Sequence, residues 1–401
     1  MTNLVPIRDL VDKVSTWNPA QSNSISTFKY IDLGTLDQSS KEITGAFDVL
    51  TKDAPSRARQ LVKSGDILVS TVRPNLNGVA VVPEELDGAT ASTGFCVLRP
   101  TSAIDGSYLF HWVRSPEFVT DMTRKATGQS YPAVSDKIIK ESRIPLPKLS
   151  DQQRISETLG EVAMLRAKRR EAITLLGEFT QSIFHDMFGD LAANAKGWDD
   201  SLSLGDVADV NSGITKGRKV SGTLRPIPYM AVLNVQDKNL DLTTVKEIEA
   251  TEDEIQRYRL LKDDLLLTEG GDPDKLGRGT LWQNELPEAI HQNHIFRVRL
   301  HPSSKVEPNF LNWLIASERG RRYFLRSAKQ TTGIASINAT QLRQFPLVIP
   351  PLALQNEFAV RLGKIKTHES TQRAHLAELD ALFASLQQRA FRGGLWDDRG
   401  N

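Results

Sequence analysis

One short motif occurs twice in this sequence, and each copy precedes a long stretch with the same apolar pattern. The motif sets a proline, a leucine and a glutamine at fixed spacing, as Pro147, Leu149 and Gln152 and again as Pro350, Leu352 and Gln355. Corresponding residues of the two copies lie at one constant offset. A pattern that returns in this way indicates a structural unit that is present twice in the chain.

The stretches behind the motifs, residues 150–190 and 351–395, have the pattern of long amphipathic helices. Their apolar residues recur at steps of three, four and seven, and no proline interrupts either stretch after its motif. Ser150 with Gln153 three residues later predicts a capping box for the first helix. The predicted apolar stripes consist of Leu159, Val162, Leu176, Phe179 and Ile183, and of Leu362, Ile365, Leu379, Leu382 and Leu386.

Helices of about 35 residues would be on the order of 50 Å long, and a helix of that length needs a surface on which to pack. Each predicted helix has a partner with a matching stripe elsewhere in the chain, so we expect the two to pair as a coiled coil. Either relative direction is sterically conceivable, because a whole globule separates the helices. A pseudo-twofold relation between the halves would make them antiparallel.

Upstream of each helix, a weaker repeat predicts one kind of globule. Buried strands are expected at 29–33 and 62–70, and again at 228–232 and 260–268. Strand-like runs follow at 79–82 and 294–300, and helix-like segments at 108–125 and 310–328. Each half is therefore a mixed α/β (α+β) globule with a long exit helix. The predicted domains are a globule at 1–149, a helix at 150–190, a linker at 191–200, a globule at 201–350 and a helix at 351–395.

Composition agrees with two folded domains. A chain of 401 residues exceeds the roughly 250 to 300 residues at which single cores stop growing.

The sequence begins without a signal-peptide pattern, and prolines interrupt its most apolar segment, 345–354, so we expect a cytoplasmic protein. Cys96 is the one cysteine, which excludes an internal disulfide and a zinc site built from several cysteines; we expect a buried apolar residue. The net charge of +1 gives no general attraction for nucleic acid, so a DNA role would need local basic patches.

Two α/β globules, each ending in the proline-leucine-glutamine motif and a long helix, resemble the specificity subunit of type I restriction-modification systems. The resemblance covers essentially the whole chain. It implies that each globule is a target recognition domain and that the two helices form an antiparallel coiled coil. It also implies binding to double-stranded DNA, to two methyltransferase subunits and to restriction (translocase-nuclease) subunits. The target would be a bipartite, asymmetric sequence whose gap is set by the coiled coil.

The resemblance implies no catalysis by this chain, and the sequence agrees. It lacks the Asn-Pro-Pro-aromatic motif of adenine methyltransferases, and residues 271–278 lack the Gly-Lys-Ser/Thr of a phosphate loop. His291 and His294 would point to opposite faces of an extended run, so we predict no metal site. We expect no cofactor on this chain, and S-adenosylmethionine, ATP and magnesium on the partner subunits.

The residues that read bases must be inferred from the chemistry of their side chains, because recognition domains differ between family members. Arginine pairs with guanine and asparagine or glutamine with adenine in the major groove. The loop candidates for this task are Arg73, Asn75 and Asn77 in the first half and Lys216, Arg218, Lys219, Gly271, Lys275 and Arg278 in the second. The alternative is an ordinary solvated loop whose asparagines and glycines serve its turns.

A second set of candidates lies just before each proline-leucine motif. Hydroxyls, glycine amides and cations there suit phosphate contacts that fix register. These candidates are Gln129, Ser130, Tyr131 and Lys137 in the first half and Lys329, Thr332, Ser336, Asn338 and Arg343 in the second. The alternative is that these segments simply join a helix to a strand.

One local feature stays open. A basic run in the first helix, Arg166 with 168–170, is either a solvated face or a surface toward gap DNA or an acidic partner.

The function of the whole chain also has alternatives to the specificity subunit. The second interpretation is a protein-binding scaffold, which the near-neutral charge of the chain would suit. A stand-alone DNA-modifying enzyme is the third interpretation, which the missing motifs disfavour.

Overall fold

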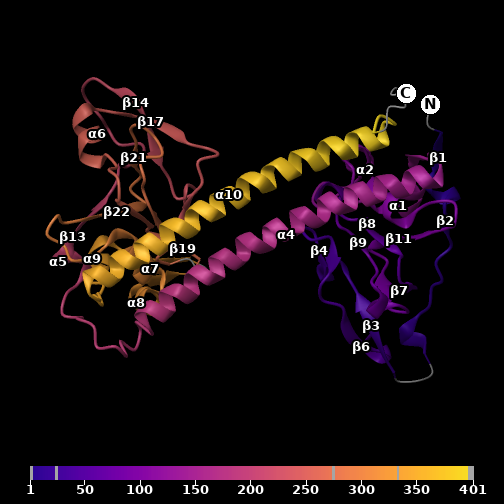
Figure 1. The fold of residues 1–401 in the computed structure, drawn as a ribbon, viewed down its shortest axis with the longest axis horizontal. Helices are drawn as coiled ribbons and strands as arrows, with labels where there is room; N and C mark the ends of the chain where they lie inside the picture. The colour runs from indigo at the N-terminus through magenta and orange to yellow at the C-terminus, as the bar shows by residue number, and fades with distance from the viewer. Residues whose placement is uncertain (1–2, 23–25, 273–275, 332–333, 396–401) are drawn as a thin grey trace. The chain divides into compact units, whose positions relative to one another are not determined.

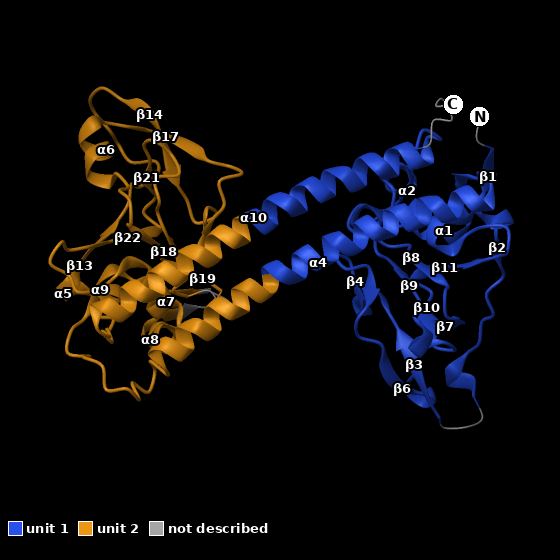
Figure 2. Cartoon of the chain, viewed as in Figure 1, with its two compact units in different colours: residues 1–173, 371–401 blue, residues 174–370 orange. Residues whose placement is uncertain are grey.

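The computed structural model describes residues 3–22, 26–272, 276–331 and 334–395. They form two compact units, one from residues 1–173 with 371–401 and one from residues 174–370 (Figure 2). Each unit contains one mixed α/β globule and part of both long helices. None of the described helices has the length and apolar composition that crossing a membrane requires.

Two four-stranded sheets form the body of the first unit (Figure 1). The antiparallel sheet has the order β2-β11-β8-β9, with strands β2 (Val11–Asp12), β11 (Phe95–Pro100), β8 (Ile67–Ser70) and β9 (Val79–Val81). The other has the order β6-β3-β10-β7 and one parallel pair, β3 with β10, among strands β6 (Phe47–Leu50), β3 (Thr27–Ile31), β10 (Thr90–Ser92) and β7 (Ala58–Leu61).

The second unit repeats this topology with one strand fewer in its second sheet. Its antiparallel sheet has the order β13-β22-β18-β20, with strands β13 (Ala208–Ser212), β22 (Ile295–Leu300), β18 (Leu265–Thr268) and β20 (Gly279–Leu281). Its other sheet has the order β17-β14-β21, with β14 and β21 parallel, and strands β17 (Lys246–Ala250), β14 (Arg225–Met230) and β21 (Ile290–His291). The runs at 79–82 and 294–300 are therefore strands but not counterparts, because β22 takes the place of β11 and β20 that of β9.

Short elements complete both units. The remaining strands are β1 (Leu4–Pro6), β4 (Leu36–Asp37), β5 (Glu42–Ile43), β12 (Arg143–Pro145), β15 (Val235–Gln236), β16 (Asn239–Leu240), β19 (Gly270–Gly271), β23 (Lys329–Thr331) and β24 (Ile334–Ser336). The 3-10 turns are η1 (Ile7–Asp9), η2 (Pro19–Gln21), η3 (Leu33–Thr35), η4 (Thr51–Asp53), η5 (Pro74–Leu76) and η6 (Glu84–Leu86). The short helices are α3 (Asp136–Glu141), α5 (Leu204–Val207), α6 (Glu252–Tyr258) and α9 (Ala339–Arg343).

The single helix predicted in each half near 108–125 and 310–328 is two helices. The first half has α1 (Gly106–Trp112) and α2 (Pro116–Lys125), and the second has α7 (Pro308–Ala316) and α8 (Glu318–Ser327). Ser115 causes the first break, because its hydroxyl accepts the Phe118 N–H at 3.2 Å and caps a new helix. The proline that follows has no N–H with which to continue α1.

A buried ion pair is present in both units at matching positions of the sequence repeat. Asp66 and Asp264 are each 1% exposed. Asp66 accepts from Nε and Nη2 of Arg99 at 2.8 and 2.6 Å, and Asp264 accepts from the same atoms of Arg299 at 2.7 and 2.6 Å. Removing either arginine would leave a buried carboxylate uncompensated, which is costly, so the aspartate has the same structural role in both copies.

The long helices are α4 (Leu149–Phe188) and α10 (Leu352–Phe391), each of 40 residues. The first unit holds the beginning of α4 and the end of α10, and the second unit holds the reverse (Figure 2). In the first unit Arg166 contacts Asp380, whereas Arg169 contacts Gln372, so the helices run in opposite directions. The antiparallel pair of long helices is thus confirmed.

Most predicted stripe residues lie where the helices pack. Leu159, Val162, Leu362 and Ile365 are buried, and Ile183, Leu379 and Leu386 pack at the edges of the cores. Leu176 is half-buried.

The prediction that Phe179 and Leu382 belong to the buried stripe is wrong. They are 56% and 46% exposed, whereas the next residues, Thr180 and Phe383, are buried. A straight α-helix drifts about 20° per heptad from a seven-residue repeat, so the buried position moves along by one residue.

The glutamine of the repeated motif fastens each long helix to its own globule. Gln152 Oε1 accepts the Asp105 N–H at 2.9 Å, and its amide donates to the Pro147 carbonyl at 2.9 Å. Gln355 does the same with the Glu307 N–H at 2.8 Å and the Pro350 carbonyl at 2.7 Å. The capping box predicted from Ser150 is wrong, since α4 begins one residue earlier, at Leu149.

Candidate nucleic-acid interface

In the first unit, the structure brings the two predicted sets of DNA-contacting residues together. The turn η5 follows β8, and its first flanking residue, Arg73, donates its N–H to the Pro132 carbonyl at 2.7 Å. The guanidinium carbon of Arg73 lies 4.7 Å from the ring centroid of Tyr131. Gln129 and Ser130 are exposed on the same loop. Loops more than fifty residues apart in the sequence thus form one surface.

The second unit joins its equivalent segments in the same way. Strand β24 pairs with β19 on one side and with β23 on the other, which places Ser336 opposite both Gly270 and Lys329. Gly271 continues β19, and Lys329 is exposed. The candidates Lys275 and Thr332 lie outside the described residues.

Hydrogen bonds to neighbouring segments hold the turn η5 in place. Arg73 and Asn77, on either side of the turn, both have a φ of +50°, the left-handed region that most side chains avoid. Asn77 donates from Nδ2 to the Arg114 carbonyl at 3.2 Å, and its own carbonyl accepts from Lys41 Nζ at 2.5 Å. Asn77 therefore has a structural task in its own turn, whereas Asn75 is exposed.

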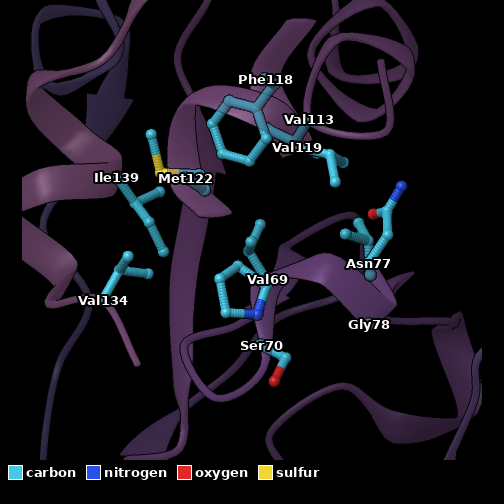
Figure 3. Close-up of a pocket in the computed structure, with 12 residues that line it drawn as sticks. Val69, Ser70, Asn77, Gly78, Val113, Phe118, Val119, Met122, Val134 and Ile139 are labelled. Atoms are coloured by element: carbon cyan, nitrogen blue, oxygen red, sulfur yellow. The ribbon is translucent and has the colours of Figure 1, made fainter. Parts of the chain in front are cut away.

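A small pocket lies under this turn (Figure 3). Apart from Ser70, Gly78 and Asn77, its lining is apolar and consists of Val69, Pro74, Val79, Val113, Phe118, Val119, Met122, Val134 and Ile139. An apolar lining offers few hydrogen-bonding groups with which to read a base edge. The pocket belongs to the packing that supports the turn.

Arg218 was predicted to contact DNA, and its fork is occupied within its own unit. Nε and Nη2 donate to the two carboxylate oxygens of Glu254 at 2.6 and 2.7 Å. These hydrogen bonds raise the pKa of Arg218 and lower the pKa of Glu254 to about 2. Lys216 and Lys219 remain exposed nearby, with Lys216 Nζ 4.9 Å from the centroid of the Tyr229 ring.

Three other candidates also have partners within the second unit. Arg278 donates from Nη1 to Gln236 at 3.1 Å, and its Nε is buried without a hydrogen bond. Asn338 caps α9 in a reciprocal capping box with Gln341. Arg343 donates from Nη2 to the Val210 carbonyl at 2.6 Å. By contrast, the Lys137 side chain in the first unit is 81% exposed and lies 3.8 Å from Glu141.

The basic run of α4 binds its partner helix. In the first unit Arg166 Nε lies 2.6 Å from Asp380 Oδ1, and Arg170 Nη2 lies 3.3 Å from the same oxygen. Arg169 donates to the side chain of Gln372 at 2.6 Å. The open interpretations of this run did not include α10, which these arginines contact, while Lys168 is exposed.

Sequence reasoning missed Lys41, which lies in the turn between β4 and β5. Burial, with the nearby charge of Arg114, lowers the pKa of Lys41 to about 8. The partly buried ammonium of Lys41 donates to the backbone beside η5 and stabilises the turn from a hairpin remote in sequence. No motif marks it, although lysine at a turn position is a weak signal.

His291, one of the two histidines considered for a metal site, lies in the core of the second unit. Its ring is fully buried, and Nδ1 lies 3.0 Å from the Tyr258 carbonyl. Among the described residues, no three His, Cys, Asp or Glu side chains gather in a way that would hold a metal ion. Cys96 is a free, buried thiol whose pKa is raised by burial, as expected for an apolar core residue.

Comparison with known families decides what this duplicated architecture is. The model of the type I restriction modification DNA specificity domain matches the chain twice, at residues 23–175 and 195–380. The chain belongs to the type I restriction-modification specificity family. The resemblance inferred from the repeated motif and the two globules is therefore confirmed.

This specificity subunit is similar to others along most of its length. It is 24% identical over 319 residues to the StySPI specificity subunit of Salmonella potsdam, and 22% identical over 320 residues to the EcoKI specificity subunit of Escherichia coli strain K12. Each match covers 75% of this chain and 68% of the relative.

Solved structures share its fold. A chain from a structure of type I restriction-modification complex assembly and conformational transition has a TM-score of 0.60 and 24% identity, covering 98% of both chains. The S subunit of a type I system from M. genitalium has a TM-score of 0.52 and 14% identity, covering 97% of this chain and 96% of that one.

Proposed function

We propose that this specificity subunit reads a bipartite, asymmetric DNA sequence in the cytoplasm, with one half-site for each globule. It recruits two methyltransferase subunits, and restriction subunits where cleavage follows. The catalytic groups, together with S-adenosylmethionine, ATP and magnesium, belong to those partners. Membership of a specificity family supports the DNA-reading role.

One observation carries the proposal most strongly: the globules share a scaffold and differ in the loops that the scaffold presents. Both contain an antiparallel four-stranded sheet of matching order, a second sheet with one parallel pair, and a buried aspartate paired with an arginine. At the end of β8 the first unit has the turn η5, whereas at the end of β18 the second has the strand β19. Different side chains on equivalent positions are what two unlike half-sites require.

The paired helices suit the role of a ruler. Both α4 and α10 run from one unit into the other. A hydrogen-bonded helix has a fixed rise of about 1.5 Å per residue, so its length sets a distance. The antiparallel pair would then set the gap between the half-sites.

The same helices offer a surface to the methyltransferase subunits. They expose apolar side chains that neither globule covers, namely Met164, Leu165, Leu175, Phe179, Val360 and Leu382. Exposed apolar groups that recur along an element favour protein association. We infer that helices of the methyltransferase partner pack here.

The test is to co-express the chain with the methyltransferase subunit of its own system and to map modified adenines across the host genome. The expected result is one split motif with a fixed gap. If a verified complex adds no methylation, the DNA-reading role is wrong.

A protein-binding scaffold is the second candidate, which the net charge of +1 favours. Phosphate contacts release counterions, so DNA binding by the assembled complex should weaken steeply as salt rises. A scaffold would show no such dependence.

A stand-alone enzyme is a further alternative. If the chain were one, it would bind ATP or S-adenosylmethionine in isolation, and we expect it to bind neither.

A further inference from the structure

Arg73 starts from a fixed backbone position. Its left-handed conformation is held at both sides, since its N–H donates to Pro132 and Val134 N–H donates to the Thr71 carbonyl at 2.9 Å. The following Pro74 is buried beneath the turn. A non-glycine residue keeps such a conformation only where the surroundings over-determine it. The direction in which the side chain leaves the turn is therefore set before any ligand arrives.

The side chain of Arg73 is exposed, and its guanidinium lies over the ring of Tyr131, which is itself 69% exposed. Stacking on an aromatic face restrains a long side chain and covers one face of the guanidinium. The N–H groups lie in the plane of the guanidinium, so stacking leaves them able to donate. Within the described ranges, no ion pair or side-chain hydrogen bond occupies them.

This distinguishes Arg73 from the other arginines that the sequence suggested for DNA contact. Arg218 donates to Glu254, Arg278 to Gln236 and Arg343 to a backbone carbonyl. A guanidinium that already donates within the protein must lose those hydrogen bonds before it can bind a base, and such a loss is costly, most of all where the acceptor is a carboxylate. Arg73 carries no such cost.

We propose that Arg73 reads a guanine in the first half-site and that Tyr131 is a positioning residue that holds its guanidinium. Guanine presents O6 and N7 to the major groove, and arginine donates to both at once. A guanidinium already restrained by stacking loses less rotamer freedom on binding. The inference rests on the proposed function and assigns one base to the first unit.

The experiment uses the purified complex of the full chain with its methyltransferase partner. Binding is measured by competition between an oligonucleotide carrying the mapped target and a set in which each base pair is replaced singly. The variants are Arg73→Ala, Arg73→Lys, Tyr131→Ala and Tyr131→Phe. Arg8→Ala serves as the matched control, because it removes another exposed arginine of the same unit.

We expect Arg73→Ala to lose about 5- to 150-fold in affinity for the target and to stop discriminating at one G·C pair of the first half-site. Arg73→Lys keeps the charge but loses the discrimination, because an ammonium cannot donate in a fixed fork. Tyr131→Ala weakens discrimination at that same base pair, and Tyr131→Phe, which keeps the ring, restores it. The second half-site and the control are unaffected.

Two results would overturn the inference while leaving the proposed function intact. If Arg73→Ala weakens all oligonucleotides equally and lowers the salt dependence by about one ion, Arg73 contacts phosphate. If Tyr131→Ala keeps full discrimination, the ring does not position the arginine. A wild-type complex that selects no split target would remove the proposed function itself, whatever the variants do. Equal thermal unfolding midpoints across the variants exclude a folding defect.

Discussion

Two buried histidines, one in each unit, make the protein sensitive to acid. Burial, together with the nearby charges of Arg114 and Arg297, lowers the pKa of His111 and of His291 to about 4. Both rings are therefore neutral in the folded protein at neutral pH. As pH falls through about 6.5, the unfolded chain takes up these protons first, so stability falls with it.

We predict that the free energy of unfolding falls by about 2 kcal/mol for each histidine between about pH 7.5 and about pH 5. The loss continues until pH reaches the folded pKa, near 4, and none occurs above the unfolded value. Denaturant titrations at several pH values measure it. His291→Gln should flatten the pH profile of the second unit. A profile parallel to that of the wild type would contradict the prediction.

Arg278 tests the second half-site. We predict that Arg278→Ala costs about 1 to 3 kcal/mol at one base pair of that half-site. Binding assays with singly substituted oligonucleotides measure it. The residue keeps one internal hydrogen bond to Gln236, so the variant should also be checked for folding. Relaxed specificity in the first half-site instead would mean that the globules are assigned the wrong way round.

At the scale of residues, the sequence shows which side chains are suited to DNA contact, but it does not show which of them already have a role in the fold. Arginine, asparagine and lysine in glycine-rich loops suggest DNA contact, but the sequence does not reveal that Glu254 faces Arg218 from 36 residues away. Asn77 and Asn338 serve a turn and a helix cap, which local patterns alone do not separate from base contact. Base contacts themselves stay predictions.

At the scale of elements, the long helices are predictable because one apolar period runs through each of them. The motif glutamines were visible as a repeat, but their hydrogen bonds to Asp105 and Glu307 depend on tertiary structure. The drift of the stripe toward Phe383 has the same origin, because a repeat of seven only approximates 3.6 residues per turn. Sequence periodicity therefore locates a helix more reliably than its buried face.

Phe358 is the element-scale test. Its fully buried ring contacts Phe184, Phe188 and Trp313 at centroid distances of 5.2, 5.6 and 5.7 Å. We predict that Phe358→Ala destabilises the second unit by about 3 to 5 kcal/mol, because it leaves a cavity where α4 and α10 pack.

The matched control for this test is Leu382→Ala, which removes an exposed side chain of α10 and should cost less than about 1 kcal/mol. Chemical denaturation compares the two variants. Equal losses would show that the buried face of α10 is misassigned.

At the scale of the whole molecule, the ruler can be tested by lengthening both helices. Seven residues inserted after Ile173 and seven after Ser370 keep the apolar stripe in phase and add about 10 Å. We predict that both half-sites are retained and that the gap grows by about three base pairs, at about 3.4 Å each. Methylation mapping reads the gap directly. An unchanged gap would refute the ruler, and an insertion in one helix only should disrupt pairing.

The distribution of the units along the chain also orders their completion during synthesis. The second unit comes from one continuous segment, 174–370, whereas the core of the first includes Phe383, Ala390 and Phe391 from the end of α10. A ribosome therefore delivers every residue of the second core before the first can close. Until then, the side chains of α1 that meet Phe391, namely Tyr108 and Trp112, lack their cover. We therefore expect the nascent first globule to leave apolar surface uncovered, and open to aggregation, until the end of α10 has been made.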